Sequence, residues 1–491
     1  MRDYQHWIDG CFVAGTSPER ITRASPAHGS LLASYAAGTD KDVDSAARAA
    51  TAAQTGWAEA TGIERASKLN ALADLMTRDQ ERLAEIEAEE AGKTIRDARG
   101  EIAHAANLAR YAAALAWEIP GRAQSHHGPS ALGLVTYEPR GVVGMITPWN
   151  FPAVTLFQKL PYALAAGNAV VIKPSELTSG STLEIAALAT EAGFPDGLIN
   201  VVTGKGTVVG TAMIEHDLIN MISFTGSTRA GVEIGAACAR RVKRAGLELG
   251  GKAANIVFAD ADLDDALDGA LLGTILNAGQ ECVAGTRILV QRSIANDFTD
   301  ALVERIKKLR IGMPLDTLAD MTSVIHEAHM TSVLGHIDQA QREGARVAAG
   351  GGRKADGDFA AGYFVQPTIL ADVSPSMTYF REEVFGPVAS ITAFDSVDEA
   401  VGLANDTPYG LGNGLWTKDI DKALQVSRRL KSGTVWVNTF LDGAPQMPFG
   451  GHKQSGLGRE NGIEGLTEFM DAKSTFIRLG KRSKALGHTV V

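Results

Sequence analysis

Hydrophobic positions in the first part of the chain recur with the period of an α-helix, and we expect three helices between about residues 40 and 117. Thr39 is suited to cap the first helix, because Asp42 follows three residues later and an alanine-rich stretch comes after it. The second helix carries a stripe of apolar residues at helical spacing: Leu69, Leu72, Leu75, Met76, Leu83 and Ile86. Gly92 is a natural stop for this helix. Such stripes predict core packing rather than contacts with a ligand.

From about residue 130 the pattern changes to short apolar runs separated by helical segments. Four of these runs show no alternation of polar and apolar residues: 142–146, 169–172, 198–202 and 221–224. Strands of this kind are buried on both faces, so they predict a parallel sheet covered by helices, the arrangement of dinucleotide-binding folds. The expected covering helices lie near 153–166, 179–192 and 229–240. A second α/β unit is expected from residue 251, with strands near 287–290 and 434–438.

The composition is that of an ordinary globular chain: of 491 residues, 45% are hydrophobic and 21% are charged. This length predicts two or three structural units. The net charge of −10 disfavours nucleic acid as a partner, because a phosphate-binding face must be basic. No segment has the length and apolarity expected of a membrane span. The basic run from Arg478 to Lys484 is interpreted as a solvated chain end.

Cysteine usage and the N-terminus favour the cytoplasm. The first ten residues lack the apolar stretch of a secretory signal. Only three cysteines occur, Cys11, Cys238 and Cys282, which argues against a disulfide framework and fits a reducing compartment. No Cys/His cluster has metal-ligand spacing, and the His126-His127 pair lies in a stretch typical of a surface connector. We therefore expect no metal site.

Cys282 and Glu248 carry the most informative chemistry. Cys282 lies in the run Asn277-Ala278-Gly279-Gln280-Glu281-Cys282-Val283-Ala284-Gly285-Thr286-Arg287, whose small residues would let a substrate approach the thiol. Glu248 lies upstream in Leu247-Glu248-Leu249-Gly250-Gly251, and a carboxylate can act as the base that a covalent intermediate later needs. A lone cysteine is most often an inert buried residue, so neither run decides the function by itself.

Further runs occur in a fixed order along the chain. They are Thr147-Pro148-Trp149-Asn150-Phe151-Pro152, Lys173-Pro174-Ser175-Glu176, Phe224-Thr225-Gly226-Ser227-Thr228-Arg229-Ala230-Gly231, Glu382-Glu383-Val384-Phe385-Gly386-Pro387 and Pro448-Phe449-Gly450-Gly451-His452-Lys453-Gln454-Ser455-Gly456. Together with the Glu248 and Cys282 segments, they give the chain a close resemblance to the aldehyde dehydrogenase superfamily from about residue 7 to about residue 480.

The resemblance implies an α/β fold with a characteristic division. A Rossmann-type parallel-sheet domain would bind the cofactor (1–118 and 140–250), and a second α/β domain would be catalytic (251–469). A small β arm (119–139 and 470–491) would serve oligomerisation into a homodimer or homotetramer.

The resemblance also assigns catalytic roles. Cys282 would add to an aldehyde, and the Asn150 carboxamide together with the Cys282 backbone N–H would stabilise the oxyanion. After hydride transfer, Glu248 would activate the water that hydrolyses the thioester, which distinguishes hydrolytic members from those that acylate coenzyme A. Lys159 and Glu460 match positions that pass protons towards solvent, and a purely structural ion pair is the alternative.

NAD is the expected cofactor, with NADP less favoured. Lys173 and Glu176 follow a buried strand, where the adenosine ribose lies in an α/β fold, and Glu176 would repel the 2′-phosphate of NADP. The helix opened by Gly226 would face the pyrophosphate with its N-terminal amides. Glu383 and Phe385 resemble the pair that holds the nicotinamide ribose and ring. The full set implied for the cofactor is Ile146, Thr147, Trp149, Lys173, Glu176, Gly226, Ser227, Thr228, Gly231, Leu249, Glu383 and Phe385.

The substrate is an aldehyde whose identity the resemblance leaves open. The residues matched to its tunnel are Phe151, Thr155, Gln158, Glu281, Val283, Leu441 and Phe449. Relatives often carry an uncharged residue where Glu281 stands. Directed into the tunnel, this carboxylate would favour aminoaldehydes or betaine aldehyde; directed into the protein, it would only pair with a base. The segment beside Cys282 has no arginine for a carboxylate-bearing substrate, which disfavours semialdehydes, and aromatic aldehydes stay an alternative.

Two other classes of function stay open at this point. A non-catalytic structural or binding protein on the same scaffold would not need Asn150, Glu248 and Cys282 together. A thiol hydrolase acting on esters without a cofactor could use Cys282, but it would leave Lys173 and Glu176 unexplained.

Overall fold

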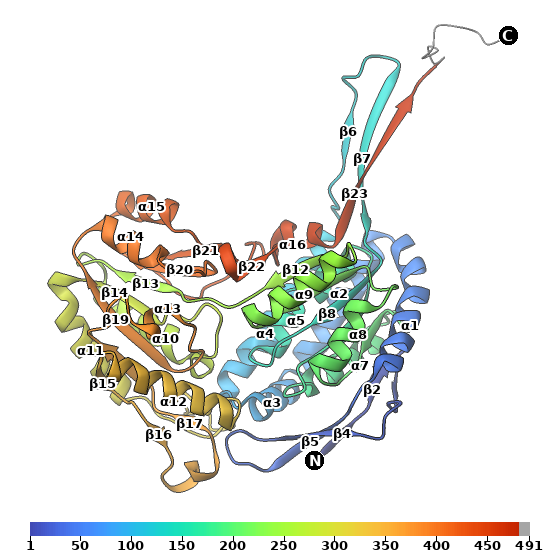
Figure 1. The fold of residues 1–491 in the computed structure, drawn as a ribbon. Coiled ribbons are helices and arrows are strands. Elements are labelled where there is room, and N and C mark those ends of the chain that lie inside the picture. The colour runs from blue at the N-terminus through green and yellow to red at the C-terminus, as the bar shows by residue number, and fades with distance from the viewer. Residues whose placement is uncertain (481–491) are drawn as a thin grey trace.

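Two large sheets organise the computed structural model, which describes residues 1–480 (Figure 1). The first sheet has the strand order β22-β12-β11-β8-β9-β10-β2-β3, and its neighbours from β12 to β10 are parallel. Its strands are β2 (His6–Ile8), β3 (Cys11–Val13), β8 (Val142–Ile146), β9 (Ala169–Lys173), β10 (Ile199–Val201), β11 (Met221–Thr225), β12 (Arg244–Glu248) and β22 (Gly456–Leu457). The four runs without alternation are thus confirmed as neighbouring parallel strands.

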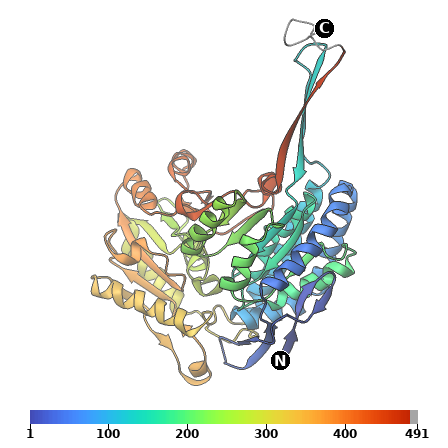
Figure 2. The same cartoon turned by 45° about the vertical axis from the view of Figure 1, so that its right-hand side comes forward.

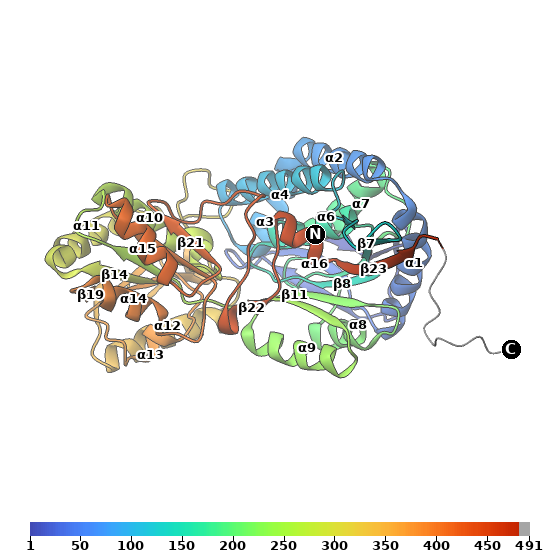
Figure 3. The same cartoon turned by 90° about the horizontal axis from the view of Figure 1, so that it is seen from above.

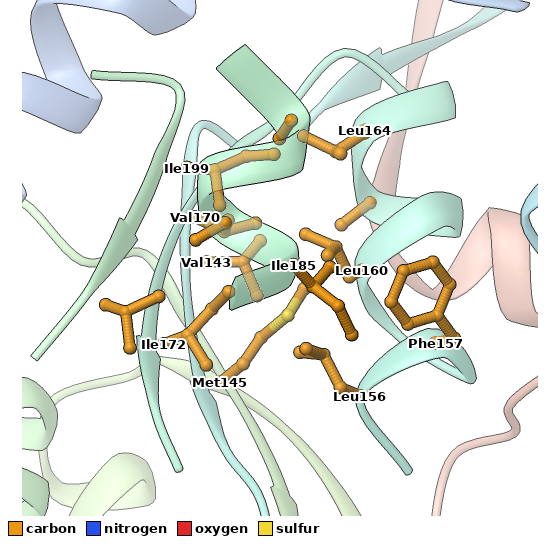
Figure 4. Packing of buried hydrophobic residues seen from close by; sticks show 14 of the residues in the cluster. Val143, Met145, Leu156, Phe157, Leu160, Leu164, Val170, Ile172, Ile185 and Ile199 are labelled. Carbon is orange, nitrogen blue, oxygen red and sulfur yellow. The ribbon is translucent and has the colours of Figure 1, made fainter. Parts of the chain in front are cut away.

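Helices cover this sheet, and every residue of β8 and β9 is buried. The cover includes α5 (Pro152–Phe157), α6 (Leu160–Ala165), α7 (Gly180–Glu191), α8 (Thr211–Glu215) and α9 (Thr228–Arg240). In Figure 4, Leu156 and Leu160 of the α5–α6 segment pack towards Met145 and Ile172 of the sheet. The core beneath the site is therefore made by the segment that also carries Asn150 and Phe151.

One helix expected near 153–166 is in fact two. α5 ends at Phe157 and α6 begins at Leu160. Pro161 lies in the first turn of α6 and has no N–H with which to continue the hydrogen bonds of α5. The break leaves Lys159 between the two helices with its side chain fully buried.

The N-terminal region has four helices, so the expectation of three was wrong. They are α1 (Asp40–Glu59), α2 (Gly62–Arg78), α3 (Gln80–Ala91) and α4 (Ile95–Leu115). The capping box of Thr39 and Asp42 is present, and Gly92 ends α3 in a left-handed conformation. The apolar stripe from Leu69 to Ile86 continues across a break at Asp79, which is why periodicity alone did not reveal two helices.

The second sheet has the order β15-β18-β19-β14-β13-β20-β21, parallel except for β15. Its strands are β13 (Ala254–Val257), β14 (Arg287–Gln291), β15 (Arg346–Ala349), β18 (Thr368–Ala371), β19 (Val388–Phe394), β20 (Gly412–Trp416) and β21 (Thr434–Val437). Its helices are α10 (Leu263–Ile275), α11 (Ala295–Lys307), α12 (Glu327–Arg342), α13 (Thr378–Arg381), α14 (Val397–Asn405) and α15 (Ile420–Arg429). The strands expected near 287–290 and 434–438 are confirmed as β14 and β21.

The chain crosses between the two sheets twice. It leaves the first sheet after Glu248 and enters the second at Ala254. It returns with β22, which pairs Gly456 with Glu248. In Figure 3, β22 lies between the two halves of the molecule, and α16 (Gly462–Glu468) follows it onto the first half. Glu248 therefore stands at the junction of the halves.

A three-stranded arm projects from the first half (Figures 1 and 2). It consists of β6 (Arg122–Gln124), β7 (Ala131–Pro139) and β23 (Met470–Arg478), and β7 pairs with β23 from Ala131 to Pro139. His126 and His127 are exposed in the turn before β7. The basic run expected at 478–484 lies mostly outside the described residues.

A small sheet at the N-terminal end was not predicted from the sequence. It consists of β1 (Arg2–Tyr4), β5 (Leu31–Ala36) and β4 (Arg20–Ala24). Another pairs β16 (Arg353–Lys354) with β17 (Phe364–Val365). Within residues 1–480, no helix has the length and apolar character needed to cross a bilayer.

Candidate active site

A cavity of about 1180 Å³ is lined by both halves of the molecule, and Cys282 opens into it. Asn150 and Glu248 line the same cavity. All the residues expected around the aldehyde line it as well: Phe151, Thr155, Gln158, Glu281, Val283, Leu441 and Phe449. Motifs that are far apart in the sequence thus meet around one thiol.

The Cys282 thiol lies among acidic side chains. It is partly exposed to the cavity. Burial, and then the carboxylates of Glu281, Glu383 and Glu248, raise the pKa of the thiol well above its ordinary value. The thiol is therefore protonated at neutral pH in the free protein, and its conversion to the nucleophilic thiolate is costly.

Glu248 ends β12 with its carboxylate buried, and neither oxygen has a hydrogen-bond partner among the described residues. Glycine is required beside it, since a Cβ at Gly450 would lie 2.9 Å from the backbone oxygen of Gly458 as well as 2.8 Å from Glu248 Oε1. Burial and the Glu460 carboxylate raise the pKa of Glu248, and Lys159 opposes this. A carboxyl group with unused hydrogen-bonding capacity in a cavity wall can hold a water and accept its proton.

Lys159 and Glu460 form a buried ion pair outside the cavity lining. The Lys159 ammonium also donates to Thr225 Oγ1 at 2.6 Å. Burial raises the pKa of Glu460, while Lys159 lowers it. Glu460 and Lys159 both act on the charge of Glu248, and neither lines the cavity that a substrate would enter.

Asn150 immediately precedes the α5 segment and is 5% exposed. Its Nδ2 donates to the carbonyl of Gln280 at 3.0 Å. A carboxamide nitrogen carries two hydrogens, so one remains for an acceptor in the cavity. The side chain can therefore donate to an oxygen of a group attached to Cys282.

Glu281 lines the cavity, and Lys93 is close enough to act on its charge. Its carboxylate lines the cavity beside Cys282, forms no ion pair within residues 1–480, and has Oε2 buried without a hydrogen-bond partner. Burial, and then the Asp97 carboxylate, raise the pKa of Glu281 to about 8, while Lys93 opposes the rise. The carboxylate can therefore bind a cationic group that enters the cavity.

Another part of the lining consists of residues expected to bind the cofactor: Trp149, Gly226, Ser227, Leu249, Glu383 and Phe385. The rings of Trp149 and Phe385 meet edge to face, with centroids 5.5 Å apart. Glu383 accepts a hydrogen bond from Gly251 N at 2.9 Å, and a Cβ at Gly250 would lie 2.3 Å from its other oxygen. Burial raises the pKa of Glu383 to about 7.

The remaining expected cofactor residues lie outside the cavity lining: Ile146, Thr147, Lys173, Glu176, Thr228 and Gly231. Lys173 ends β9, and its Nζ lies 3.2 Å from Glu176 Oε2. Ser227 caps α9 by accepting from Ala230 N at 3.3 Å. These features fit a dinucleotide: a carboxylate can bind a ribose diol, and a helix N-terminus can bind a diphosphate. Both lie at the carboxyl ends of parallel strands.

Several cavity residues had no signal in the sequence: Arg96, Asp97, Glu101, His104, Trp436, Asp442 and Met447. Asp97 and Glu101 come from α4, and Trp436 comes from β21, so no motif links them to Cys282. Asn277 and Gln280 support the site from behind. They lie in the same run as Cys282, and that run could have indicated them.

Known proteins resemble this chain over nearly its whole length. The model of the aldehyde dehydrogenase family matches residues 12–475. An NAD-dependent aldehyde dehydrogenase from Sinorhizobium meliloti is 43% identical with a TM-score of 0.97, covering 99% of this chain and 96% of that chain. A putative aldehyde dehydrogenase from Burkholderia cenocepacia is 40% identical with a TM-score of 0.95, covering 97% and 98%. The betaine aldehyde dehydrogenase of Staphylococcus aureus, solved with NAD+, is 38% identical with a TM-score of 0.96, covering 99% and 97%.

Proposed function

We propose that this chain, which belongs to the aldehyde dehydrogenase family and oxidises an aldehyde to the carboxylic acid with NAD, prefers aldehydes that carry a cationic nitrogen. This preference is inferred from Glu281, which lies beside the nucleophile. Its carboxyl group forms no ion pair with a cationic side chain in the described structure. A betaine aldehyde dehydrogenase among the similar structures adds support.

In the first half of the reaction, the Cys282 thiol loses its proton to solvent in the cavity, the thiolate adds to the aldehyde carbon, and the substrate oxygen becomes an oxyanion. The Asn150 carboxamide and the Cys282 backbone N–H donate to this oxygen, and removal of one such donor typically costs about 2.7–4 kcal/mol in activation free energy. Trp149, Glu383 and Phe385 would hold the nicotinamide end of the cofactor. When bound, NAD supplies the acceptor for the hydride that leaves the substrate carbon.

In the second half, water attacks the thioester carbon and the Cys282 sulfur leaves as the thiolate. Glu248 holds this water and accepts its proton, a role that suits a buried carboxylate with both oxygens unpartnered in the described structure. The Lys159–Glu460 pair behind Glu248 receives the proton and relays it away from the site.

The charges of the cavity favour a cation over an anion. Its lining includes the carboxylates of Asp97, Glu101, Glu248, Glu281, Glu383 and Asp442, and the guanidinium of Arg96. Lys93 pairs with Glu101, and Arg96 lies 3.6 Å from Asp97. When it is ionised, Glu281 therefore adds to an excess of negative charge in the cavity. The rings of Trp436 and Phe449 also line the cavity and can receive a cation on their faces.

Rates of NADH formation test the preference with a pair of substrates that differ only in charge. The pair is 4-(trimethylammonio)butanal and the analogue with a tert-butyl group in place of the trimethylammonium group. At pH 9.0, where Glu281 is mostly ionised, we expect kcat/KM to be roughly 5- to 150-fold higher for the cation, which corresponds to about 1–3 kcal/mol for a shielded charge pair. Glu281→Gln should erase most of this difference without lowering the rate of the neutral aldehyde. Equal values in the wild-type protein would rule out selection by Glu281.

A carboxylate-bearing aldehyde is the second candidate, because Arg96 also lines the cavity. Its guanidinium is shared with Asp97 and Asp320, at 3.6 and 3.7 Å, which weakens its attraction for a substrate carboxylate. Succinic semialdehyde in the same assay distinguishes the two candidates. A higher kcat/KM for it than for the cationic aldehyde would favour Arg96 as the selecting residue.

We also propose that the arm joins copies of the chain into a homodimer or homotetramer in the cytoplasm. β23 is an edge strand of the arm, and Phe476 on it is 66% exposed. An exposed edge strand is a template for pairing with another chain. Cys11, Cys238 and Cys282 are all free thiols, as a reducing compartment requires. Sedimentation velocity of the intact protein measures the assembly; a monomer at micromolar concentration would contradict it.

A further inference from the structure

The backbone carbonyl of Asn150 receives two buried side-chain donors from distant parts of the chain. Lys93, which follows α3, donates from Nζ at 2.7 Å. Asn277, in the turn after α10, donates from Nδ2 at 2.8 Å. Lys93 is 1% exposed and Asn277 is 3% exposed. Neither side chain lines the cavity, so neither contacts the substrate there.

Lys93 fixes the segment around Asn150 at more than one point. Its ammonium pairs with Glu101, and the second oxygen of Glu101 accepts from Val154 N at 3.1 Å in α5. The same ammonium lies over the ring of Phe151, 4.4 Å from its centroid. One buried cation thus connects α4 to both ends of the segment from Asn150 to Val154.

Asn277 connects Asn150 to the loop of the nucleophile. Asn277 and Ala278 adopt left-handed φ values of 47° and 54°, which non-glycine residues keep only where their surroundings enforce them. Gln280 Nε2 donates to Asn277 O at 2.9 Å, and the carbonyl of Gln280 accepts from Asn150 Nδ2. The hydrogen bonds therefore form a closed circuit of Asn150, Asn277 and Gln280, two residues before Cys282.

We propose that Lys93 and Asn277 are positioning residues for oxyanion stabilisation. By holding the Asn150 carbonyl they fix the main chain of Asn150 relative to the Cys282 loop, so that the N–H not used by Gln280 is directed at the substrate oxygen. This role rests on the proposed function of Asn150 as an oxyanion donor. It predicts slower hydride transfer in their variants without a loss of cofactor affinity.

The test measures the single-turnover burst of NADH, the Kd for NAD and the Tm in matched variants. Glycine accepts the left-handed backbone at position 277, so Asn277→Gly removes the carboxamide without straining the loop. Lys93→Met combined with Glu101→Gln removes the cation together with its partner. Asn168→Ala is the control. Its buried carboxamide donates to Ala163 O and Phe469 O, away from the cavity.

We expect the burst rate to fall roughly 10- to 100-fold in both positioning variants, because small misplacements of a catalytic group have effects of this size. The Kd for NAD should stay near the wild-type value. Asn168→Ala should lower the Tm and keep the burst rate. A wild-type burst rate in either positioning variant overturns the role of that residue. If Asn150→Ala itself keeps the burst rate, the oxyanion role of Asn150 fails and the positioning role fails with it.

Discussion

Raising the pH should increase the preference for a cationic aldehyde, because Glu281 changes its charge in an accessible range. Its pKa is raised to about 8, so the neutral carboxyl group predominates below that pH and the carboxylate above it. A single titration with this pKa gives about 3% carboxylate at pH 6.5 and about 90% at pH 9.0. If only the carboxylate attracts the cation, the ratio of the two kcat/KM values should rise by up to about 30-fold across this range, since kcat/KM follows the ionisation of the free enzyme.

The assay compares 4-(trimethylammonio)butanal with its tert-butyl analogue at constant ionic strength, with initial rates of NADH formation at each pH. A quaternary nitrogen has no proton to lose, so the substrate charge is fixed. Titration of Cys282, Glu248 or Glu383 changes kcat/KM for both substrates, so its effect largely cancels in the ratio of the two values. Asp97 and Lys93 also act on Glu281, and Glu281→Gln retains both of them. The ratio should therefore be flat with pH in this variant. A flat ratio in the wild-type protein, or an equal rise in the variant, would refute the reasoning.

Three further predictions concern the nucleophile, the base and the cofactor. Cys282→Ala should abolish aldehyde oxidation and leave the Kd for NAD nearly unchanged in a fluorescence titration; appreciable turnover would exclude Cys282 as the nucleophile. Glu248→Gln should keep the single-turnover burst of NADH while steady-state turnover falls roughly 10²- to 10⁴-fold, because the base acts only on the thioester. Loss of the burst as well would place Glu248 before hydride transfer. Glu176→Ser should narrow or reverse the preference for NAD over NADP in kcat/KM, because the variant no longer repels a 2′-phosphate, and a wild-type protein that prefers NADP would contradict this assignment.

The parallel strands of the first sheet could be predicted because burial on both faces leaves a continuous apolar run, as in β8 and β9. Helix breaks were harder to predict. At Asp79 the apolar stripe continues through the junction. At Lys159 the helical segment breaks just before Pro161, and the buried ammonium pairs with Glu460, which lies far along the chain. The domain boundaries stay a prediction.

The residues of the cavity also include some that the sequence could predict and some that it could not. Glu281 and Val283 could be placed around Cys282 because they are its neighbours in sequence. Asp97 and Trp436 could not, since only the packing of α4 and β21 around the cavity brings them there. The orientation of the Glu281 side chain also depended on tertiary structure, because adjacent residues of a loop can point in opposite directions.

The carboxylates around Cys282 impose a cost that the substrate itself can reduce. Glu281, Glu383 and Glu248 all raise the pKa of the thiol, so each disfavours the thiolate that attacks the aldehyde. A cationic group bound at Glu281 offsets one of these negative charges at the moment when the thiolate must form. Substrate selection and nucleophile activation therefore depend on the same carboxylate. Removal of the charge at position 281 should slow the oxidation of cationic aldehydes, whereas for neutral aldehydes it removes a repulsion and leaves their rate unchanged or higher.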